Sequence, residues 1–516
     1  MDSLRDAENE ISESFSPCSA PFLDDSLLEE DTVKYHMSLL PNATQAGDEG
    51  FEQAPIVSSS VLNKNQTQEN KITQYGLLAA TRTLPSTDPE QDPRLFFNIS
   101  HPSSVFICGS QASGKSHTLS CLLENCLIPS KAGRLPNPLT AVVFHYDTFI
   151  SDDSGYPCEA AFLSSHPDVK VRVLCSPTNF WTMKQTYSKF NITVEPLHID
   201  QKDLNTKRMM DLMAVSQTDG DMPLYMHTVK RILRQMRIRQ QEAHTGFSYT
   251  DFKARILSAR LTPAQVEPLK QRLDTLESFM AQAQVTARPS KDGQKRGSLW
   301  DAVPGLLTIV DLSCPCISPE TACSLFNICL GIFLKPDQQE VGRVIALDEA
   351  HKFMTTTPEA RTFTETLLSS VRLQRHLGAR IIISTQEPTI STALLNLCTV
   401  IIVHRFTSPE WLRILQKHVA GAAMSPFTSA SAPAPNSTSS NDAGAEEGNE
   451  ATKSLFERIV RLGVGEALVF APSAVVVNGQ VGGDDGCEVR KLGEGGLRVM
   501  VRKRLTVDGG KSVLSG

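Results

Sequence analysis

The sequence contains no apolar run that approaches the roughly 18 residues of a membrane span. Its amino-terminal region is acidic, whereas a secretory signal peptide starts with basic residues before an apolar stretch. The 12 cysteines lack the spacing of a disulfide framework, and Cys108, Cys121, Cys329 and Cys398 fall inside apparent strands or helices, as reduced buried thiols do. We therefore expect an intracellular protein, in the nucleus or the cytoplasm, that spans no membrane.

A zinc site is also not expected. Cys314-Pro315-Cys316 is a closely spaced cysteine pair, but no second Cys/His pair at ligand spacing accompanies it.

The net charge of −7 is unevenly distributed along the 516 residues. Residues 1–52 hold thirteen acidic residues against Arg5 and Lys34, a net −11, so the remainder is −7 minus −11, or +4. Residues 1–90 are predicted to form a disordered acidic region, because they are rich in polar residues and cannot bury enough apolar surface. Within it, residues 22–31 mix acids with large apolar side chains, which fits either a docking motif for a protein partner or a solvated acidic tail.

The rest of the chain is predicted to be one interrupted domain. We expect a folded core over residues 91–419, with a helical insertion at about 200–300, and a completion of that core over residues 454–507. A low-complexity insert over residues 420–453, rich in Ala, Ser, Pro and Asn, interrupts the core, and residues 508–516 form a tail.

A glycine-rich segment lies between a short apolar strand pattern and a helical pattern. It fits G-x-x-x-x-G-K-[ST] and comprises Gly109, Ser110, Gln111, Ala112, Ser113, Gly114, Lys115 and Ser116, followed by His117. Backbone N–H groups of such a turn point at nucleotide phosphates, and the following helix adds the positive end of its dipole. We therefore predict that ATP binds here, with Lys115 on the β- and γ-phosphates and the Ser116 hydroxyl on Mg²⁺.

A later apolar strand pattern ends in two adjacent acids, Asp348 and Glu349. Beside a phosphate loop, Asp348 would support Mg²⁺, and Glu349 would orient and deprotonate the attacking water. The alternative, in which the acids only cap the next helix, is disfavoured because buried strands seldom end in paired acids that meet no cation. A third strand, ending at Gln386, supplies a candidate sensor of the γ-phosphate.

The repeated alternation of strands and helices predicts an α/β fold with a mostly parallel sheet covered on both faces. In the helical insertion, Lys230, Arg234 and Arg237 fall on one helix face. That basic face could meet nucleic acid, or it could be an ordinary solvated face.

The sequence contains four motifs in the following order: the phosphate loop, Asp348-Glu349-Ala350-His351, Arg375-x-x-Gly378 with a strand ending at Gln386-x-Pro388, and Gly465-Glu466-Ala467. Together they resemble the HerA–FtsK group of P-loop ATPases, in particular HerA-like ATPases of eukaryotic type, over residues 95–507. The resemblance implies a RecA-like core, ATP hydrolysis, a homo-oligomeric ring with a hexamer as one candidate size, and translocation of DNA or RNA. It also implies an arginine acting in trans, for which Arg372, Arg375, Arg380 and Arg405 are all candidates.

Two other functions share features with this sequence. The letters of Asp348 to His351 also occur in DEAH-box helicases, but Lys115 and Asp348 are 348 − 115 = 233 residues apart, and too little chain follows for a second motor domain. The other alternative is a protein-interaction switch gated by nucleotide, in which slow hydrolysis resets the insertions.

Overall fold

The computed structural model describes residues 51–65, 72–81, 92–152, 155–213, 224–285, 297–335, 341–419, 455–477 and 489–509. The strands of these residues are β1 (Ile56–Ser58), β2 (Tyr75–Thr81), β3 (Arg94–Asn98), β4 (Ser104–Cys108), β5 (Gly133–Arg134), β6 (Thr140–His145), β7 (Lys170–Cys175), β8 (Thr193–Pro196), β9 (Leu306–Asp311), β10 (Arg343–Leu347), β11 (Ala379–Thr385), β12 (Val400–Val403), β13 (Glu466–Phe470), β14 (Val475–Val477), β15 (Val489–Lys491) and β16 (Gly496–Val501). The α-helices are α3 (Ser59–Asn65), α4 (Lys115–Leu127), α5 (Phe180–Thr186), α6 (Thr206–Met213), α7 (Leu224–Ala243), α8 (Tyr249–Leu257), α9 (Pro263–Ser278), α10 (Gln282–Val285), α11 (Pro319–Phe333), α12 (Pro358–Arg372), α13 (Gln374–Leu377), α14 (Thr392–Leu397) and α15 (Pro409–His418). Short 3-10 turns are η2 (Glu159–Ser165), η3 (Pro177–Asn179), η4 (Gln201–Asp203), η5 (Ala350–Lys352) and η6 (Pro388–Ile390).

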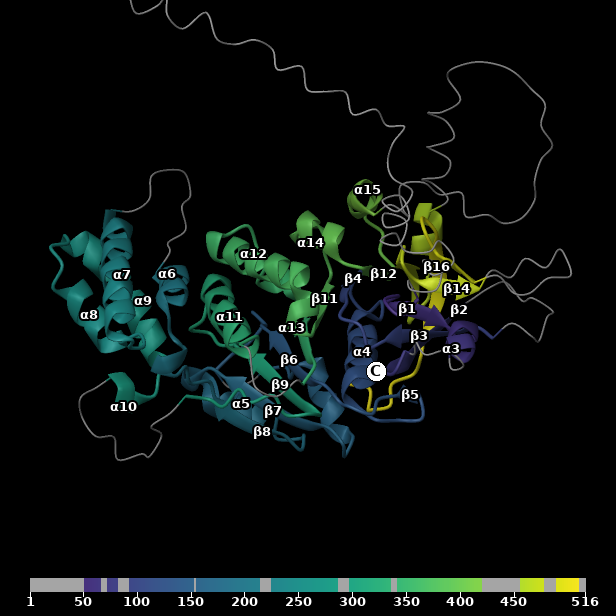
Figure 1. Ribbon diagram of the computed structural model, residues 1–516, viewed down its shortest axis with the longest axis horizontal. Coiled ribbons are helices and arrows are strands. Elements are labelled where there is room, and N and C mark those ends of the chain that lie inside the picture. The colour runs from purple at the N-terminus through teal and green to yellow at the C-terminus, as the bar shows by residue number, and fades with distance from the viewer. Residues whose placement is uncertain are drawn as a thin grey trace, which may run out of the picture. The chain divides into compact units, whose positions relative to one another are not determined.

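All the strands belong to one sheet, in the order β15-β14-β1-β3-β2-β16-β13-β12-β4-β11-β10-β6-β9-β7-β8, with β5 paired to β2 (Figure 1). From β12 to β8 every neighbouring pair is parallel. From β12 to β3 the neighbours are antiparallel. The predicted α/β fold with a mostly parallel sheet is confirmed, and the strands β4, β11 and β10, which precede the predicted site residues, are adjacent.

The parallel strands are buried on both faces, and their side chains alternate between two apolar clusters. In β4, Phe106 and Cys108 belong to one cluster, whereas Val105 and Ile107 belong to the other. Helix α4 packs on the second face with Leu119, Leu122 and Leu123, and α11 and α12 cover the first. This alternation is why the strands read as nearly continuous apolar runs in the sequence.

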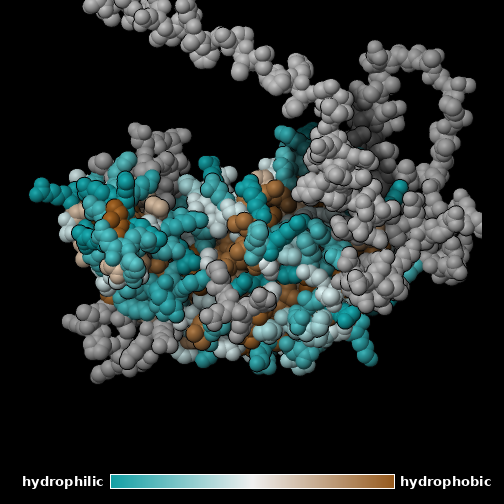
Figure 2. Space-filling view, in the orientation of Figure 1, coloured by the Kyte–Doolittle hydropathy of each residue, from teal (hydrophilic) through white to brown (hydrophobic). Residues whose placement is uncertain are grey.

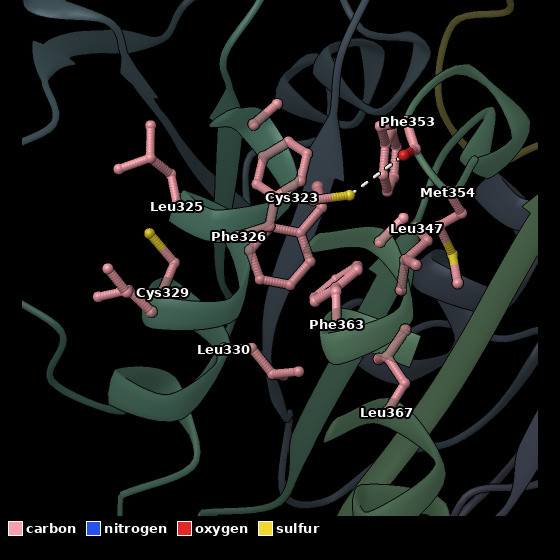
Figure 3. Close-up of a cluster of buried hydrophobic side chains, with 14 of the residues drawn as sticks. Cys323, Leu325, Phe326, Cys329, Leu330, Leu347, Phe353, Met354, Phe363 and Leu367 are labelled. Carbon is pink, nitrogen blue, oxygen red and sulfur yellow. Dashed lines mark hydrogen bonds between the residues drawn. The ribbon is translucent and has the colours of Figure 1, made fainter. Parts of the chain in front are cut away.

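Phenylalanine side chains pack among leucines, cysteines and a methionine between the sheet and the helices α11 and α12 (Figure 3). Phe326 of α11 lies 5.0 Å from Phe353 and 6.3 Å from Phe363 of α12, measured between ring centroids. The Cys323 thiol donates a hydrogen bond of 3.1 Å to the Phe353 carbonyl. This cluster fixes the chain that follows β10, and therefore the acids that follow that strand.

The predicted helical insertion is present between β8 and β9 as α6 to α10, and α7 contacts α6, α8 and α9 (Figure 1). Thr262 precedes α9, and Pro263 occupies its first turn as the sequence predicted. The Thr262 N–H donates to Oε1 of Gln265, the reciprocal half of a capping box. The visible face over these helices is largely hydrophilic (Figure 2).

The prediction of disorder throughout residues 1–90 was wrong for residues 51–65 and 72–81. These residues form β1, α3 and β2, and β2 pairs with β3 on one side and β16 on the other. The reason is that their apolar side chains, such as Ile56, Val57 and Leu78, are too few for a core of their own but extend an existing one.

The remaining predictions of disorder, for residues 1–50, 66–71 and 82–90 and for the insert 420–453, lie outside the described residues. On either side of that insert, β12 and β13 pair in antiparallel fashion. In the described part of the chain, no helix has both the length and the apolar character to cross a membrane. All described cysteines are free thiols.

Candidate functional site

The predicted phosphate loop connects the end of β4 to the first residue of α4. Gly109 and Gly114 have φ of 154° and 111°, and Ala112 has φ of 57°. A Cβ on Gly109 would lie 2.7 Å from Cβ of His404, so only glycine fits between the loop and the neighbouring strand. The loop is thus held in a left-handed conformation that turns its backbone toward the start of α4.

Lys115 is the first residue of α4, and its side chain is 3% exposed. Its Nζ donates to the Ser110 carbonyl at 3.1 Å and lies 4.0 Å from Oε1 of Glu349. Burial lowers the pKa of Lys115, and the charges of Glu349 and Asp348 partly offset this effect. The ammonium therefore lies between the phosphate loop and the predicted acids.

Asp348 follows β10 and is almost completely buried. Its Oδ2 accepts hydrogen bonds from Nδ1 of His145 at 3.2 Å and from the Cys158 thiol at 3.6 Å. Burial alone would raise the pKa of Asp348, but the hydrogen bond and charge of His145, with the charge of Lys352, lower it. The carboxylate is therefore ionised, as a ligand of a cation must be.

The second oxygen of Asp348, Oδ1, is buried and has no hydrogen-bond partner among the described residues. A buried carboxylate oxygen without a partner is costly unless a cation or an ordered water meets it. Ser116, at the start of α4, offers a partly exposed hydroxyl. Asp348 and Ser116 therefore fit Mg²⁺, which prefers oxygen ligands and usually retains several waters.

Glu349 adopts a left-handed backbone conformation with φ of 50°. Its Oε2 accepts from Nε2 of Gln386 at 3.3 Å and lies 3.4 Å from Nδ1 of His351. Burial and the charge of Asp348 raise the pKa of Glu349 above its ordinary value. A glutamate made more basic in this way is suited to accept a proton from water near neutral pH.

The strand order explains why Gln386 meets Glu349. β11 lies between β4 and β10, with Thr385 opposite Cys108 and Ile383 opposite Leu347. The residues that follow these three parallel strands therefore meet at one edge of the sheet. Lys115, Glu349 and Gln386 form a continuous series of contacts there.

Sequence reasoning assigned no role to His351. Its Nδ1 accepts the backbone N–H of Gln386 at 3.4 Å, so it contacts both the predicted base and the predicted sensor. Burial, with the charge of Lys352, lowers the pKa of His351 to about 4, so the ring is neutral at physiological pH. The signal available in the sequence was its position, two residues after Glu349.

His404 and the late Gly465-Glu466 segment support the phosphate loop from behind. Nδ1 of His404 faces the Glu466 carbonyl at 2.9 Å, and its Nε2 faces the Thr118 hydroxyl at 2.9 Å. Burial lowers the pKa of His404 to about 3, so a neutral ring donates through Nδ1 and accepts the hydroxyl at Nε2. The Gly465 N–H donates to the Ser113 carbonyl of the loop.

The segment after β16 holds helix α4. Oε2 of the fully buried Glu124 accepts from Nη1 of Arg502 at 2.7 Å, and its Oε1 accepts from the Thr506 hydroxyl at 2.6 Å. Nε2 of His117 lies 2.8 Å from the Arg502 carbonyl. The His117 side chain thus faces this segment, next to the predicted nucleotide site.

The four candidate arginines occupy different places. Arg380 is buried, and its guanidinium donates to the carbonyls of Gly378 at 2.9 Å and Ser100 at 3.0 Å, so it is not available to a neighbouring subunit. Arg405 is exposed, and its carbonyl accepts the Ser110 N–H of the phosphate loop.

Arg372 and Arg375 are exposed before the start of β11, the opposite end of that strand from Gln386. They therefore lie away from the phosphate loop of their own chain.

The predicted basic face of α7 is exposed at Lys230, Arg234 and Arg237. The opposite face of this helix is buried through Val229, Ile232, Leu233 and Met236. The basic side chains therefore lie on the solvent-exposed face of α7.

No protein-family model and no curated protein matches the chain. Among solved structures, VirB4 of Thermoanaerobacter pseudethanolicus is 10% identical, with 83% of this chain and 96% of that chain covered and a TM-score of 0.44. The bacterial conjugative coupling protein TrwB is 13% identical, with 88% and 96% covered and a TM-score of 0.39. The genome packaging NTPase B204 from Sulfolobus turreted icosahedral virus 2 is 9% identical, with 72% and 92% covered and a TM-score of 0.27.

Because these TM-scores are below 0.5, the fold is assigned from the chain's own strand order and phosphate loop. On that basis the protein has an α/β P-loop fold built on a mostly parallel sheet.

Proposed function

We propose that this protein is a Mg²⁺-dependent ATPase. The observation that supports the proposal is the series of contacts from Lys115 through Glu349 to Gln386 at the sheet edge that also carries the phosphate loop. The three parallel strands β4, β10 and β11 bring these residues together. A part of the sheet with only a structural role would not need a buried lysine, a glutamate of raised pKa and an amide in contact.

The residues have distinct roles in this proposal. Lys115 binds the β- and γ-phosphates, and the Ser116 hydroxyl with Asp348 holds Mg²⁺, which neutralises phosphate charge. Glu349 orients the attacking water and accepts its proton. Gln386 donates to Glu349 and would turn its amide to the γ-phosphate when ATP is bound.

The test is release of phosphate from ATP in Mg²⁺ and in excess chelator. Lys115→Ala should abolish ATP binding and turnover, because it removes the only cation that contacts both the loop carbonyl and Glu349 among the described residues. Lys270→Ala is the matched control, since Lys270 is exposed on α9 and pairs only with Glu267 in the described structure. Equal activity of both variants would refute the proposed site.

We further propose a ring-forming translocase of HerA-like type, on the strength of the four motifs. Its nucleic-acid contact would be the exposed basic face of α7, at Lys230, Arg234 and Arg237. Contact with about four to six phosphates should make the logarithm of the binding constant fall linearly with the logarithm of the salt concentration, with a slope of roughly −3 to −5. DNA or RNA should therefore stimulate hydrolysis at low salt, and charge reversal at Arg234 should reduce the stimulation.

Deleting the acidic residues 1–50 should strengthen that stimulation by removing a competitor for the basic face. If neither polymer changes the rate at about 50 mM salt, with or without residues 1–50, the translocase proposal fails. The nucleotide-gated interaction switch, with the acidic region as the contact for a protein partner, then becomes the better explanation. The contact of His117 with the Arg502 carbonyl gives such a switch a physical route from the site to the C-terminal segment.

The ring makes a separate prediction about arginine. Arg372, Arg375 and Arg405 remain exposed candidates for action on a neighbouring subunit. Specific activity should rise with protein concentration, and an alanine variant at the acting arginine should regain activity when mixed with Glu349→Gln subunits. A monomer in the presence of ATP whose activity is independent of concentration would contradict the ring.

A further inference from the structure

A second group of ligand-type side chains lies behind Asp348. His145 ends β6, Cys158 precedes η2, and Asp348 follows β10, so the group joins three separate parts of the chain. One ligand atom of each residue lies within 4.8 Å of the other two, and all three residues are buried. No other group of this kind occurs among the described residues. The Cys314 and Cys316 pair is not part of it.

The distances fit a tetrahedral zinc ion. With Zn–N and Zn–O bonds near 2.0 Å and a Zn–S bond near 2.3 Å, tetrahedral angles place N and O about 3.3 Å apart and S and O about 3.5 Å apart. The observed separations from Oδ2 of Asp348 are 3.2 Å to Nδ1 of His145 and 3.6 Å to the Cys158 sulfur.

The cluster is enclosed by the protein, and its polar atoms contact one another. The side chains of His145 and Asp348 are more than nine-tenths buried, and Cys158 is fully buried. The hydrogen bonds of Nδ1 of His145 and of the Cys158 thiol both end on Oδ2 of Asp348, so a cation between the three atoms would replace contacts within the cluster. The neighbouring Asp311 is not part of the group, because its two oxygens accept from the Tyr187 hydroxyl and the Ser313 N–H.

We propose that His145, Cys158 and Asp348 form an inhibitory Zn²⁺ site, with one imidazole, one thiolate and one carboxylate ligand. Such a set selects zinc over magnesium, because thiolate and imidazole suit Zn²⁺ whereas Mg²⁺ takes oxygen ligands. Binding converts the Cys158 thiol to a thiolate and releases its proton to solvent. A water molecule would complete the coordination.

Occupancy of this site would inhibit ATP hydrolysis, a consequence that rests on the proposed function. Zinc would take Oδ2 of Asp348 and neutralise the carboxylate that is proposed to support Mg²⁺. The ion would thus couple the availability of zinc to the activity of the enzyme, without contact with the phosphate loop itself.

The first experiment measures binding, which does not depend on activity. Metal-free full-length protein is dialysed against Zn²⁺ in excess Mg²⁺ and its zinc content measured, and the same protein is titrated with Co²⁺ to detect a sulfur-to-cobalt charge-transfer band. We expect one zinc per chain and a band that disappears in Cys158→Ser. Loss of even an outer-shell partner weakens metal binding about 10- to 100-fold, so loss of this ligand should weaken it at least about 10-fold.

Serine at position 158 can still donate a hydrogen bond to Asp348, so this variant removes the soft ligand with little change in packing. Cys175→Ser is the matched control, because Cys175 is an equally buried thiol that donates to the Glu195 carbonyl. Cys316→Ser tests binding to the exposed thiol. Both controls should bind zinc like the wild type.

The second experiment measures inhibition of ATPase activity by Zn²⁺ as a fraction of each protein's zinc-free rate. The inhibitory concentration should rise at least about 10-fold in Cys158→Ser and stay unchanged in Cys175→Ser. The absence of a charge-transfer band in wild-type protein, or a band that is lost in Cys316→Ser and kept in Cys158→Ser, would overturn the site. A zinc-binding protein without ATPase activity would instead contradict only the proposed function.

Discussion

Glu349→Gln is the substitution that best separates ATP binding from chemistry. Glutamine has nearly the same size as glutamate, and its amide oxygen can still accept the 3.3 Å hydrogen bond from Nε2 of Gln386. The variant removes the proton acceptor and the negative charge that lies 4.0 Å from Nζ of Lys115. We expect turnover to fall by about 10² to 10⁴, which is the usual contribution of a general base and corresponds to about 3 to 5.5 kcal/mol in the activation free energy.

Binding of ATP and stability should respond differently from turnover. A negative charge near the γ-phosphate is removed, so affinity for ATP should stay equal or increase. Burial and the charge of Asp348 raise the pKa of Glu349 in the folded protein, so its ionised form lowers the free energy of unfolding as the pH rises through that pKa. The neutral glutamine should therefore not lower the melting temperature at neutral pH.

The assays are steady-state phosphate release, equilibrium binding of a fluorescent ATP analogue, and thermal unfolding. Glu359→Gln is the comparison, because Glu359 is a buried acid of α12 that contacts Arg272 away from the loop. It should change stability more than turnover. Wild-type turnover in Glu349→Gln would remove Glu349 as the base, whereas loss of ATP binding together with turnover would show that the residue is needed for the structure of the site.

Three further predictions concern other parts of the fold. Arg502→Met should lower the free energy of unfolding by about 1.5 to 3 kcal/mol in urea titrations at pH 7, because it removes the closer of the two buried arginines that pair with the fully buried Glu124 and leaves Arg504 at 3.8 Å. The hydrogen bonds and charges around Glu124 outweigh its burial and lower its pKa, so the loss should shrink as the pH falls through that lowered pKa, below which the carboxyl is protonated in both the folded and the unfolded state. A loss that stays constant with pH would contradict this pairing. His351→Ala should lower kcat about 10-fold or more with ATP affinity unchanged. His351→Asn, whose amide oxygen can replace Nδ1 as acceptor of the Gln386 N–H, should restore most of the lost kcat. A failure of this rescue would refute a positioning role for His351. Replacing residues 425–450 with a short Gly/Ser linker should shift stability by less than about 1 kcal/mol, and a large fall in melting temperature would mean that this segment folds.

Local patterns in the sequence were sufficient to predict the central sheet and the phosphate loop. The glycines at 109 and 114 are fixed by short-range geometry, because their positive φ angles favour a residue without a side chain, and Lys115 follows from the spacing of the motif. The strand that precedes Asp348 is a continuous apolar run, which a parallel sheet buried on both faces requires. The capped start of α9 was predictable for the same reason, since a cap involves residues only a few positions apart.

Long-range contacts were decided only by the tertiary structure. Nothing near Asp348 in the sequence indicates that His145 and Cys158 meet it, because the order of β6, β10 and η2 in space brings together residues about 200 positions apart. Residues 51–65 and 72–81 look too polar to fold, and their apolar side chains are buried because β2 pairs between β3 and β16 and β1 pairs with the other side of β3. Likewise, Arg380 cannot be told from Arg372 or Arg375 by pattern, since its burial depends on the carbonyls that the fold places around it. Short-range geometry is encoded by neighbouring residues, whereas the partners of a buried polar group depend on which strands become neighbours in the sheet.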